Sequence, residues 1–132
     1  MGAYGDCDIV STPPRLYNAC GTTTTFSETI AHLEQMDALI APDSFLTHLG
    51  GALGIPTVPL MSTVPARLRC SRHSSITPLE PDFPCAPCMM TTEERWPEGF
   101  DDCHAFRSPS MRSAHVFRTL ERIRLRTATP AG

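Results

Sequence analysis

The chain has 132 residues, which is enough to bury one hydrophobic core and predicts a single domain. Its formal net charge is only -3, so we expect no overall field that would recruit nucleic acid or an anionic membrane surface. It contains neither a run of roughly 20 apolar residues nor a signal-peptide pattern at its start, which predicts a cytoplasmic protein without a transmembrane segment.

The first well-defined element lies in the stretch TFSETIAHLEQM, residues 25–36. Thr25 followed by Glu28 fits a capping box, in which the two residues satisfy each other's backbone N–H groups. The apolar side chains recur at helical spacing. We therefore predict a helix from about residue 26 to residue 36, with Phe26, Ile30 and Leu33 on its apolar face.

A short apolar run, DALIAP, occupies residues 37–42 and ends at a proline, which predicts a buried strand. Asp43 or Ser44 can then cap a second helix, because both residue types accept hydrogen bonds from first-turn N–H groups. Gly54 is typical of a helix stop. The apolar stripe of this helix consists of Leu46, Leu49 and Leu53.

PTVPLM, residues 56–61, predicts a second strand, in which Pro59 indicates an edge position or an early end. The order helix, strand, helix, strand favours an α/β fold with parallel strands. Residues 62–108 are rich in Pro, Ser and Cys without sustained periodicity, so we predict an irregular insert. Ser108 and Pro109 begin a closing helix to about residue 126. Its predicted apolar face consists of Met111, Phe117, Leu120 and Ile123.

Four cysteines in this insert fit a tetrahedral zinc or iron site. Cys85 and Cys88 form a C-x2-C pair, and 14 residues separate the pair from Cys70 on one side and from Cys103 on the other. A bound metal would order a proline-rich segment that lacks a core. The same residues also fit packed thiols without a metal. Two histidines are possible substitute ligands: His73 and His104.

The turn at Asp43 and Ser44 is the clearest candidate binding site. A helix N-terminus offers unpaired N–H groups and a partial positive charge, which suit a phosphate at the carboxyl edge of a parallel sheet. Asp43 could then hold ligand hydroxyls and Ser44 a diphosphate, with His48 facing the same ligand one turn later. The alternative is that Asp43 only caps the helix and that His48 lies at its surface.

Residues 36–67, MDALIAPDSFLTHLGGALGIPTVPLMSTVPAR, resemble the nucleotide-sugar-binding motif of glycosyltransferase family 9, the lipopolysaccharide heptosyltransferase family. In that family an apolar strand leads into Asp-[Ser/Thr]-Gly-x-x-His-x-Ala-x-Ala-x-x-x-Pro. NACGTTTTFSETIAHLEQ is similar to the family's Gly-x-[Ser/Thr]-[Ser/Thr] turn and helix, and DFPCAPC with Cys103 to its cysteine-bearing loop. Phe45 stands where the family commonly has Gly. The matching positions are Asp43, Ser44, His48, Ala52 and Pro56.

The resemblance implies a GT-B fold, in which two Rossmann-like domains enclose the active site. It covers residues 18–123, so residues 1–132 would form a partial C-terminal, donor-binding domain that includes the 62–108 insert. The acceptor domain, which carries the base expected for catalysis, would be a separate partner, and the catalytic residue is therefore unknown. We expect the isolated chain to be inactive for this reason.

The implied activity is inverting transfer of a sugar from a nucleoside-diphosphate sugar, such as ADP-heptose, to a glycan or lipopolysaccharide-type acceptor, with no cofactor required. Asp43 would contact the sugar hydroxyls, Ser44 the diphosphate, and His48 the diphosphate or the sugar. Thr22 and Thr23 would line the nucleotide side. Two other functions stay open: a non-catalytic binding module, and a small domain stabilised by a four-cysteine metal site.

Overall fold

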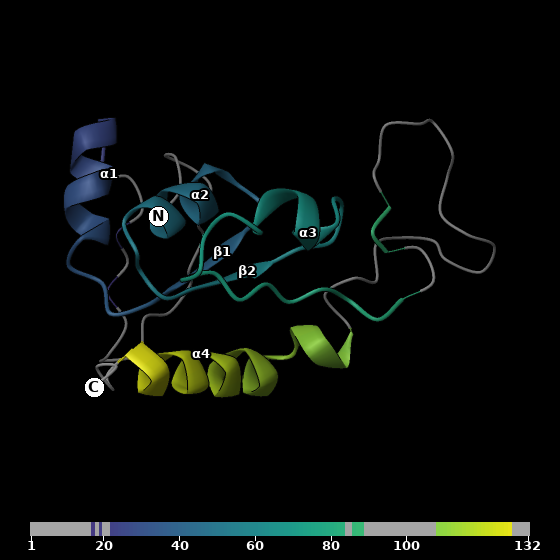
Figure 1. The fold of residues 1–132 in the computed structure, drawn as a ribbon. Coiled ribbons are helices and arrows are strands. Elements are labelled where there is room, and N and C mark those ends of the chain that lie inside the picture. The colour runs from purple at the N-terminus through teal and green to yellow at the C-terminus, as the bar shows by residue number, and fades with distance from the viewer. Residues whose placement is uncertain (1–16, 18, 20–21, 84–85, 89–107, 128–132) are drawn as a thin grey trace. The chain divides into compact units, whose positions relative to one another are not determined.

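The computed structural model describes residues 17, 19, 22–83, 86–88 and 108–127 of the chain (Figure 1). The chain forms two compact units, Met1–Gln35 and Met36–Gly132. The described part of the first unit contains one helix, and the second unit contains the sheet. No helix in the described part of the chain is long and apolar enough to cross a bilayer.

Helix α1, Phe26–Leu33, begins with the capping box that the sequence predicts. The Glu28 N–H donates to Thr25 Oγ1 (3.2 Å), and the N–H of Thr25 donates to Glu28 Oε2 (3.0 Å). Thr24 adds a third bond from its N–H to the same carboxylate oxygen (2.7 Å). The bonds from the Thr24 and Thr25 N–H groups favour the ionised carboxylate and lower the pKa of Glu28. The helix ends at Leu33, earlier than the predicted end at residue 36.

Strands β1, Leu39–Pro42, and β2, Thr57–Leu60, form a parallel pair in which Leu39 lies opposite Thr57. Helix α2, Phe45–Ala52, connects them and packs against both. It is followed by Gly54 with φ +72, a left-handed conformation that glycine adopts without strain, so the predicted helix stop is confirmed. The α/β class with parallel strands is also confirmed, and it is compatible with a Rossmann-like half.

Residues 75–79 extend this sheet beyond β2, although they lie in the segment predicted to be irregular. Thr57 N–H donates to the Ser75 carbonyl (2.9 Å), and the Thr77 and Leu79 N–H groups donate to the carbonyls of Thr57 and Pro59 (2.8 and 2.9 Å). Pro59 has no N–H to return to this ladder, which leaves two isolated parallel bridges at this edge. Helix α3, Ala66–Arg69, lies in the connection between β2 and these residues.

The two faces of β2 are covered by different helices (Figure 1). Val58 belongs to a core cluster with Leu79 from the neighbouring segment and with Met111 and Val116 from the C-terminal helical region. Met61, just after β2, belongs to a second cluster on the α3 side. Alternation along the strand therefore gives both faces of the sheet an apolar layer. The second cluster consists of Met61, Ala66, Cys70 and Ile76.

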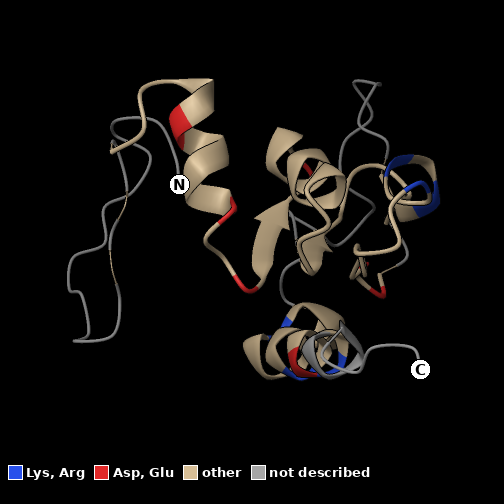
Figure 2. Cartoon of the chain, turned by 60° about the vertical axis from the view of Figure 1, so that its left-hand side comes forward, with Lys and Arg blue, Asp and Glu red and all other residues tan. Residues whose placement is uncertain are grey.

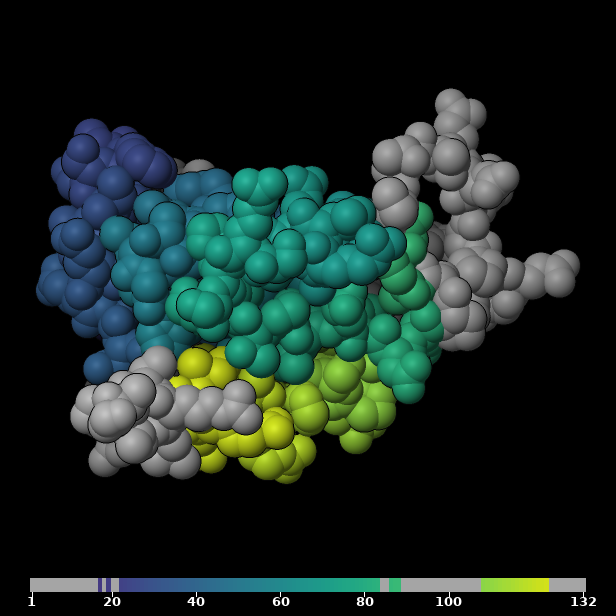
Figure 3. All heavy atoms as spheres, viewed as in Figure 1, coloured from purple at the N-terminus to yellow at the C-terminus, as the bar shows by residue number. Residues whose placement is uncertain are grey.

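The C-terminal region contains a 3-10 turn, η2, at Pro109–Met111, and helix α4, Ser113–Thr127. The extended ψ of 143 at Arg112 separates the two, so the predicted continuous helix is interrupted. The predicted core position of Phe117 is wrong: this side chain is 60% exposed, and Val116 is buried in its place. Residues following β2 run along α4 in the space-filling view (Figure 3).

Candidate functional site

The turn formed by Asp43 and Ser44 follows β1 directly and begins α2. It therefore lies at the carboxyl edge of the parallel sheet, where ligands bind in open α/β folds. Both residues are half-buried. His48, also half-buried, lies one helical turn after Ser44, so the i, i+4 spacing sets the two residues on the same side of α2.

Ser44 is the N-cap residue of α2, but its side chain makes no capping hydrogen bond. Its hydroxyl is buried and has no hydrogen-bond partner in the described part of the chain. The turn is fixed instead by Thr47, whose N–H donates to the Ser44 carbonyl (3.1 Å) and whose hydroxyl donates to the Pro42 carbonyl (2.8 Å). The start of α2 is thus rigidly placed without being closed by a side-chain cap.

Asp43 supplies negative charge to this edge of the sheet. Burial, followed by the charges of Asp43 and Glu80, raises the pKa of the Cys70 thiol. Both carboxylates are therefore close enough to Cys70 to act on its ionisation. Arginines in the described part of this unit lie on or next to α3 and on or next to α4, as Figure 2 shows. The α3 helix carries Arg67 and Arg69 in its last turn.

Thr22 and Thr23 belong to the first unit, whereas the turn at Asp43 belongs to the second. The Thr22 hydroxyl donates to the Ala19 carbonyl within its own turn (2.8 Å). Thr23 is half-buried. Their assignment to the nucleotide side of a donor stays a prediction.

The four predicted metal-binding cysteines are only partly covered by the described residues. Cys85 and Cys103 lie outside them. Cys70 is 4% exposed, Cys88 is half-buried, and both are free thiols. Among the residues that the structure describes, no group of three or more His, Cys, Asp and Glu side chains is arranged to hold a metal ion. The four-cysteine site stays a prediction.

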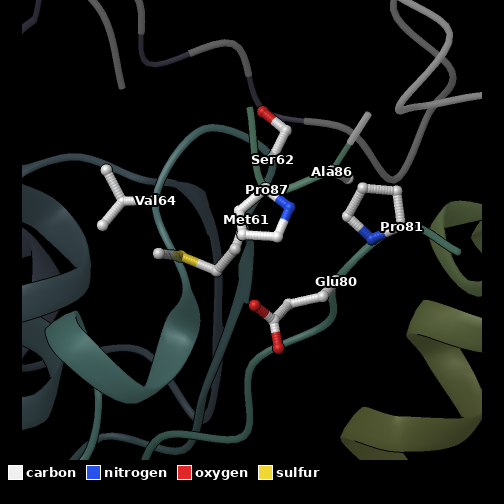
Figure 4. A pocket seen from close by; sticks show the side chains of 7 residues that line it. All are labelled: Met61, Ser62, Val64, Glu80, Pro81, Ala86 and Pro87. Carbon is white, nitrogen blue, oxygen red and sulfur yellow. The ribbon is translucent and has the colours of Figure 1, made fainter. Parts of the chain in front are cut away.

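A pocket of about 190 Å³ opens at the same edge of the sheet, where β2 and the segment 75–79 end (Figure 4). Glu80 and Ser62 are its polar side chains; Glu80 follows Leu79 directly, and Ser62 lies two residues after the end of β2. Glu80 Oε1 accepts a hydrogen bond from the Ala66 N–H at the start of α3 (2.9 Å). The remaining lining residues are apolar: Met61, Val64, Pro81, Ala86 and Pro87.

Comparison with known protein families shows to which family this sheet edge and its neighbouring residues belong. Residues 10–96 match the family model described as glycosyltransferase family 9 (heptosyltransferase). The chain belongs to glycosyltransferase family 9. The matched range of this glycosyltransferase domain includes the Asp43 turn, both strands, α3 and the pocket beside Glu80, whereas α4 lies beyond it. No curated protein and no solved structure matches the chain.

Two residues of the family 9 domain that shape this edge were missed by the sequence analysis. Thr47 is fully buried and holds the turn through Pro42, but a threonine inside a helix carries no distinctive pattern. Glu80 follows the extended segment ending at Leu79. The apolar residues before Glu80, in the stretch SITPLE, gave a signal for this segment, which Pro78 obscured.

Proposed function

We propose that this glycosyltransferase domain binds a nucleoside-diphosphate sugar at the start of α2 and presents the sugar for transfer to a glycan or lipopolysaccharide-type acceptor. The observation that carries the proposal is the buried hydroxyl of Ser44, which has no partner in the described part of the chain, at a helix start without a side-chain cap. If the Ser44 side chain rotates toward solvent, a phosphate oxygen at the positive end of the helix dipole would accept its hydrogen bond.

The roles of the neighbouring residues follow from their chemistry. Asp43 would accept hydrogen bonds from sugar hydroxyls, since a carboxylate next to a diphosphate is better suited to neutral donors than to phosphate oxygens. His48 would donate to the diphosphate from the next turn of α2. Phe45, at the position where the family commonly has Gly, is 56% exposed, so its side chain does not fill the turn.

Transfer would proceed with inversion at the anomeric carbon. A base deprotonates the acceptor hydroxyl, the acceptor oxygen attacks the anomeric carbon, and the bond to the diphosphate breaks with its electron pair on the leaving oxygen. The start of α2 would stabilise that leaving group. In this proposal the domain is the donor half of a GT-B enzyme, and the base lies on a separate acceptor domain.

Isothermal titration with ADP and ADP-heptose tests the donor site. We expect saturable binding to the wild-type chain and a loss of about tenfold or more in affinity for both ligands in Ser44→Ala, because a hydrogen bond to a charged group is lost. Asp43→Ala should weaken ADP-heptose more than ADP.

The matched control is Asp37→Ala, which removes an exposed carboxylate of the same unit before β1. Its affinity for both ligands should equal that of the wild type. Absence of ADP binding by folded wild-type chain, or equal affinities of the wild type and Ser44→Ala, would contradict the proposed function.

A further inference from the structure

The pocket beside Glu80 has an unusual balance of chemistry for an edge predicted to bind a diphosphate. Its described lining contains one carboxylate, one hydroxyl and five apolar side chains, and no Lys, Arg or His. A phosphate or carboxylate ligand would meet the negative charge of Glu80 without a compensating cation. A single carboxylate is also a poor cage for Ca²⁺, which takes roughly six to eight oxygen ligands.

Glu80 is held in place by the fold, which distinguishes it from a mobile surface carboxylate. Its Oε1 accepts from the Ala66 N–H (2.9 Å), and its carbonyl accepts from the Ser110 hydroxyl (2.7 Å). On the opposite wall, the Ser62 carbonyl accepts from the Cys88 N–H (3.4 Å). Both polar lining residues are therefore fixed through their backbones by segments distant in sequence.

The second carboxylate oxygen of Glu80 has no hydrogen-bond donor in the described part of the chain. In Figure 4 the Glu80 side chain extends toward the Met61 side of the pocket, below Pro87, while Ser62 and Pro81 lie above it. A sugar ring presents hydroxyl donors along its edge and C–H groups on its faces. The carboxylate and the proline rings match these two kinds of surface.

We propose that this pocket is a subsite for a neutral polyhydroxylated group, in which Glu80 and Ser62 bind hydroxyls and Pro81 and Pro87 contact the C–H face. The inference rests on the proposed function and deepens it: the start of α2 binds the diphosphate, and the Glu80 pocket selects the sugar. Glu80 would act on affinity for the sugar part alone, because phosphate contacts belong to a different element.

The test compares ADP with ADP-heptose on Glu80→Gln by isothermal titration. The glutamine keeps an oxygen that accepts the Ala66 N–H, so α3 stays capped, which equal thermal melting curves would verify. We expect ADP-heptose to bind about tenfold more weakly, because a charged hydrogen bond becomes a neutral one, and ADP to bind unchanged. Ser62→Ala should cause a smaller loss of the same kind. Glu121→Gln, an exposed glutamate on α4, is the charge-matched control and should behave as the wild type.

Equal effects of Glu80→Gln on both ligands, or no effect on either, would overturn the subsite while leaving the donor site at Ser44 intact. A second measurement keeps the subsite testable if ADP itself fails to bind. Free heptose and mannose at millimolar concentration should shift the backbone amide resonance of Ala66 in the wild type and leave it unmoved in Glu80→Gln. No shift with either sugar, or a shift only with an alkylammonium probe, would overturn the proposal.

Discussion

The N-termini of α1 and α2 differ in how they are capped. Each helix leaves backbone N–H groups without partners in its own first turn. At α1, Thr25 and Glu28 take up these groups within the helix itself. At α2, Ser44 occupies the equivalent cap position with an extended backbone, yet its side chain makes no capping bond and its hydroxyl is buried.

This difference arises because α1 is stabilised at its start by local contacts, whereas α2 is held by contacts with the strands. The capping box of α1 is local and needs no other element. The start of α2 is fixed through Thr47 to the end of β1, and its later residues pack onto the strands. Tertiary contacts thus hold α2 without a side-chain cap, and the Ser44 hydroxyl keeps no partner in the described part of the chain. The start of α2, which is held without a side-chain cap, is therefore better suited to bind a ligand than the capped start of α1.

The largest expected effect tests whether packing holds α2. A Cβ at Gly50 would lie 2.6 Å from Thr57 Oγ1 and 2.9 Å from Leu39 Cδ2. The Thr57 hydroxyl donates to the Ile55 carbonyl (2.8 Å), so moving it would break a buried hydrogen bond. We expect Gly50→Ala to lower the free energy of unfolding by about 1–3 kcal/mol, even though alanine favours helix. Urea unfolding measures this change.

Ser27→Ala, at an exposed position of α1, is the control for helix propensity alone. It should leave the unfolding free energy unchanged or raise it slightly, since alanine is the better helix former. A Gly50→Ala protein as stable as the wild type would show that α2 can move away from the strands, and the contrast between the two helices would then lose its basis.

The second prediction compares the two cap residues directly. Thr25→Ala removes the side chain that accepts the Glu28 N–H, and should destabilise α1 by about 1 kcal/mol. Ser44→Ala removes a buried hydroxyl without a partner in the described part of the chain, so we expect no loss of stability or a slight gain. Amide hydrogen exchange in α1 and α2 reports each helix separately. If Ser44→Ala destabilised α2 as much as Thr25→Ala destabilises α1, the Ser44 hydroxyl would have to make a stabilising hydrogen bond, which would contradict its proposed availability to a ligand.

The sequence predicted the elements whose signals are local. Thr25 with Glu28 identified the start of α1, and the apolar runs around Ile40 and Val58 identified both strands. The segment 75–79 was missed, because Pro78 and Pro59 weaken its strand signal while the hydrogen bonds that form it come from β2. At the candidate site, Asp43 and Ser44 were placed correctly after β1. The buried Ser44 hydroxyl without a partner in the described part of the chain, and the Thr47 bond to the Pro42 carbonyl, are tertiary features that no local pattern encodes.

The smallest expected effect concerns the carboxylate near the start of each helix, Glu28 for α1 and Asp43 for α2, and is measured through the ionisation of Cys70. Glu28 accepts backbone hydrogen bonds, whereas Asp43 helps to raise the pKa of Cys70 after the larger contribution of burial. Below the ordinary thiol pKa of 9.0, Cys70 is protonated both folded and unfolded. Above it the unfolded thiol ionises first, so the unfolding free energy falls as pH rises toward the folded-state pKa.

Urea unfolding under reducing conditions at about pH 7 and about pH 10 measures this fall. The unfolding free energy should decrease more between these two pH values for the wild type than for Cys70→Ala. Asp43→Asn should reduce the difference, because the folded thiolate then meets less negative charge, whereas Asp37→Asn should not. Equal pH slopes for the wild type and Cys70→Ala would mean that the Cys70 thiol ionises as readily in the folded chain as in the unfolded one, and the charge of Asp43 would then not extend along this edge of the sheet.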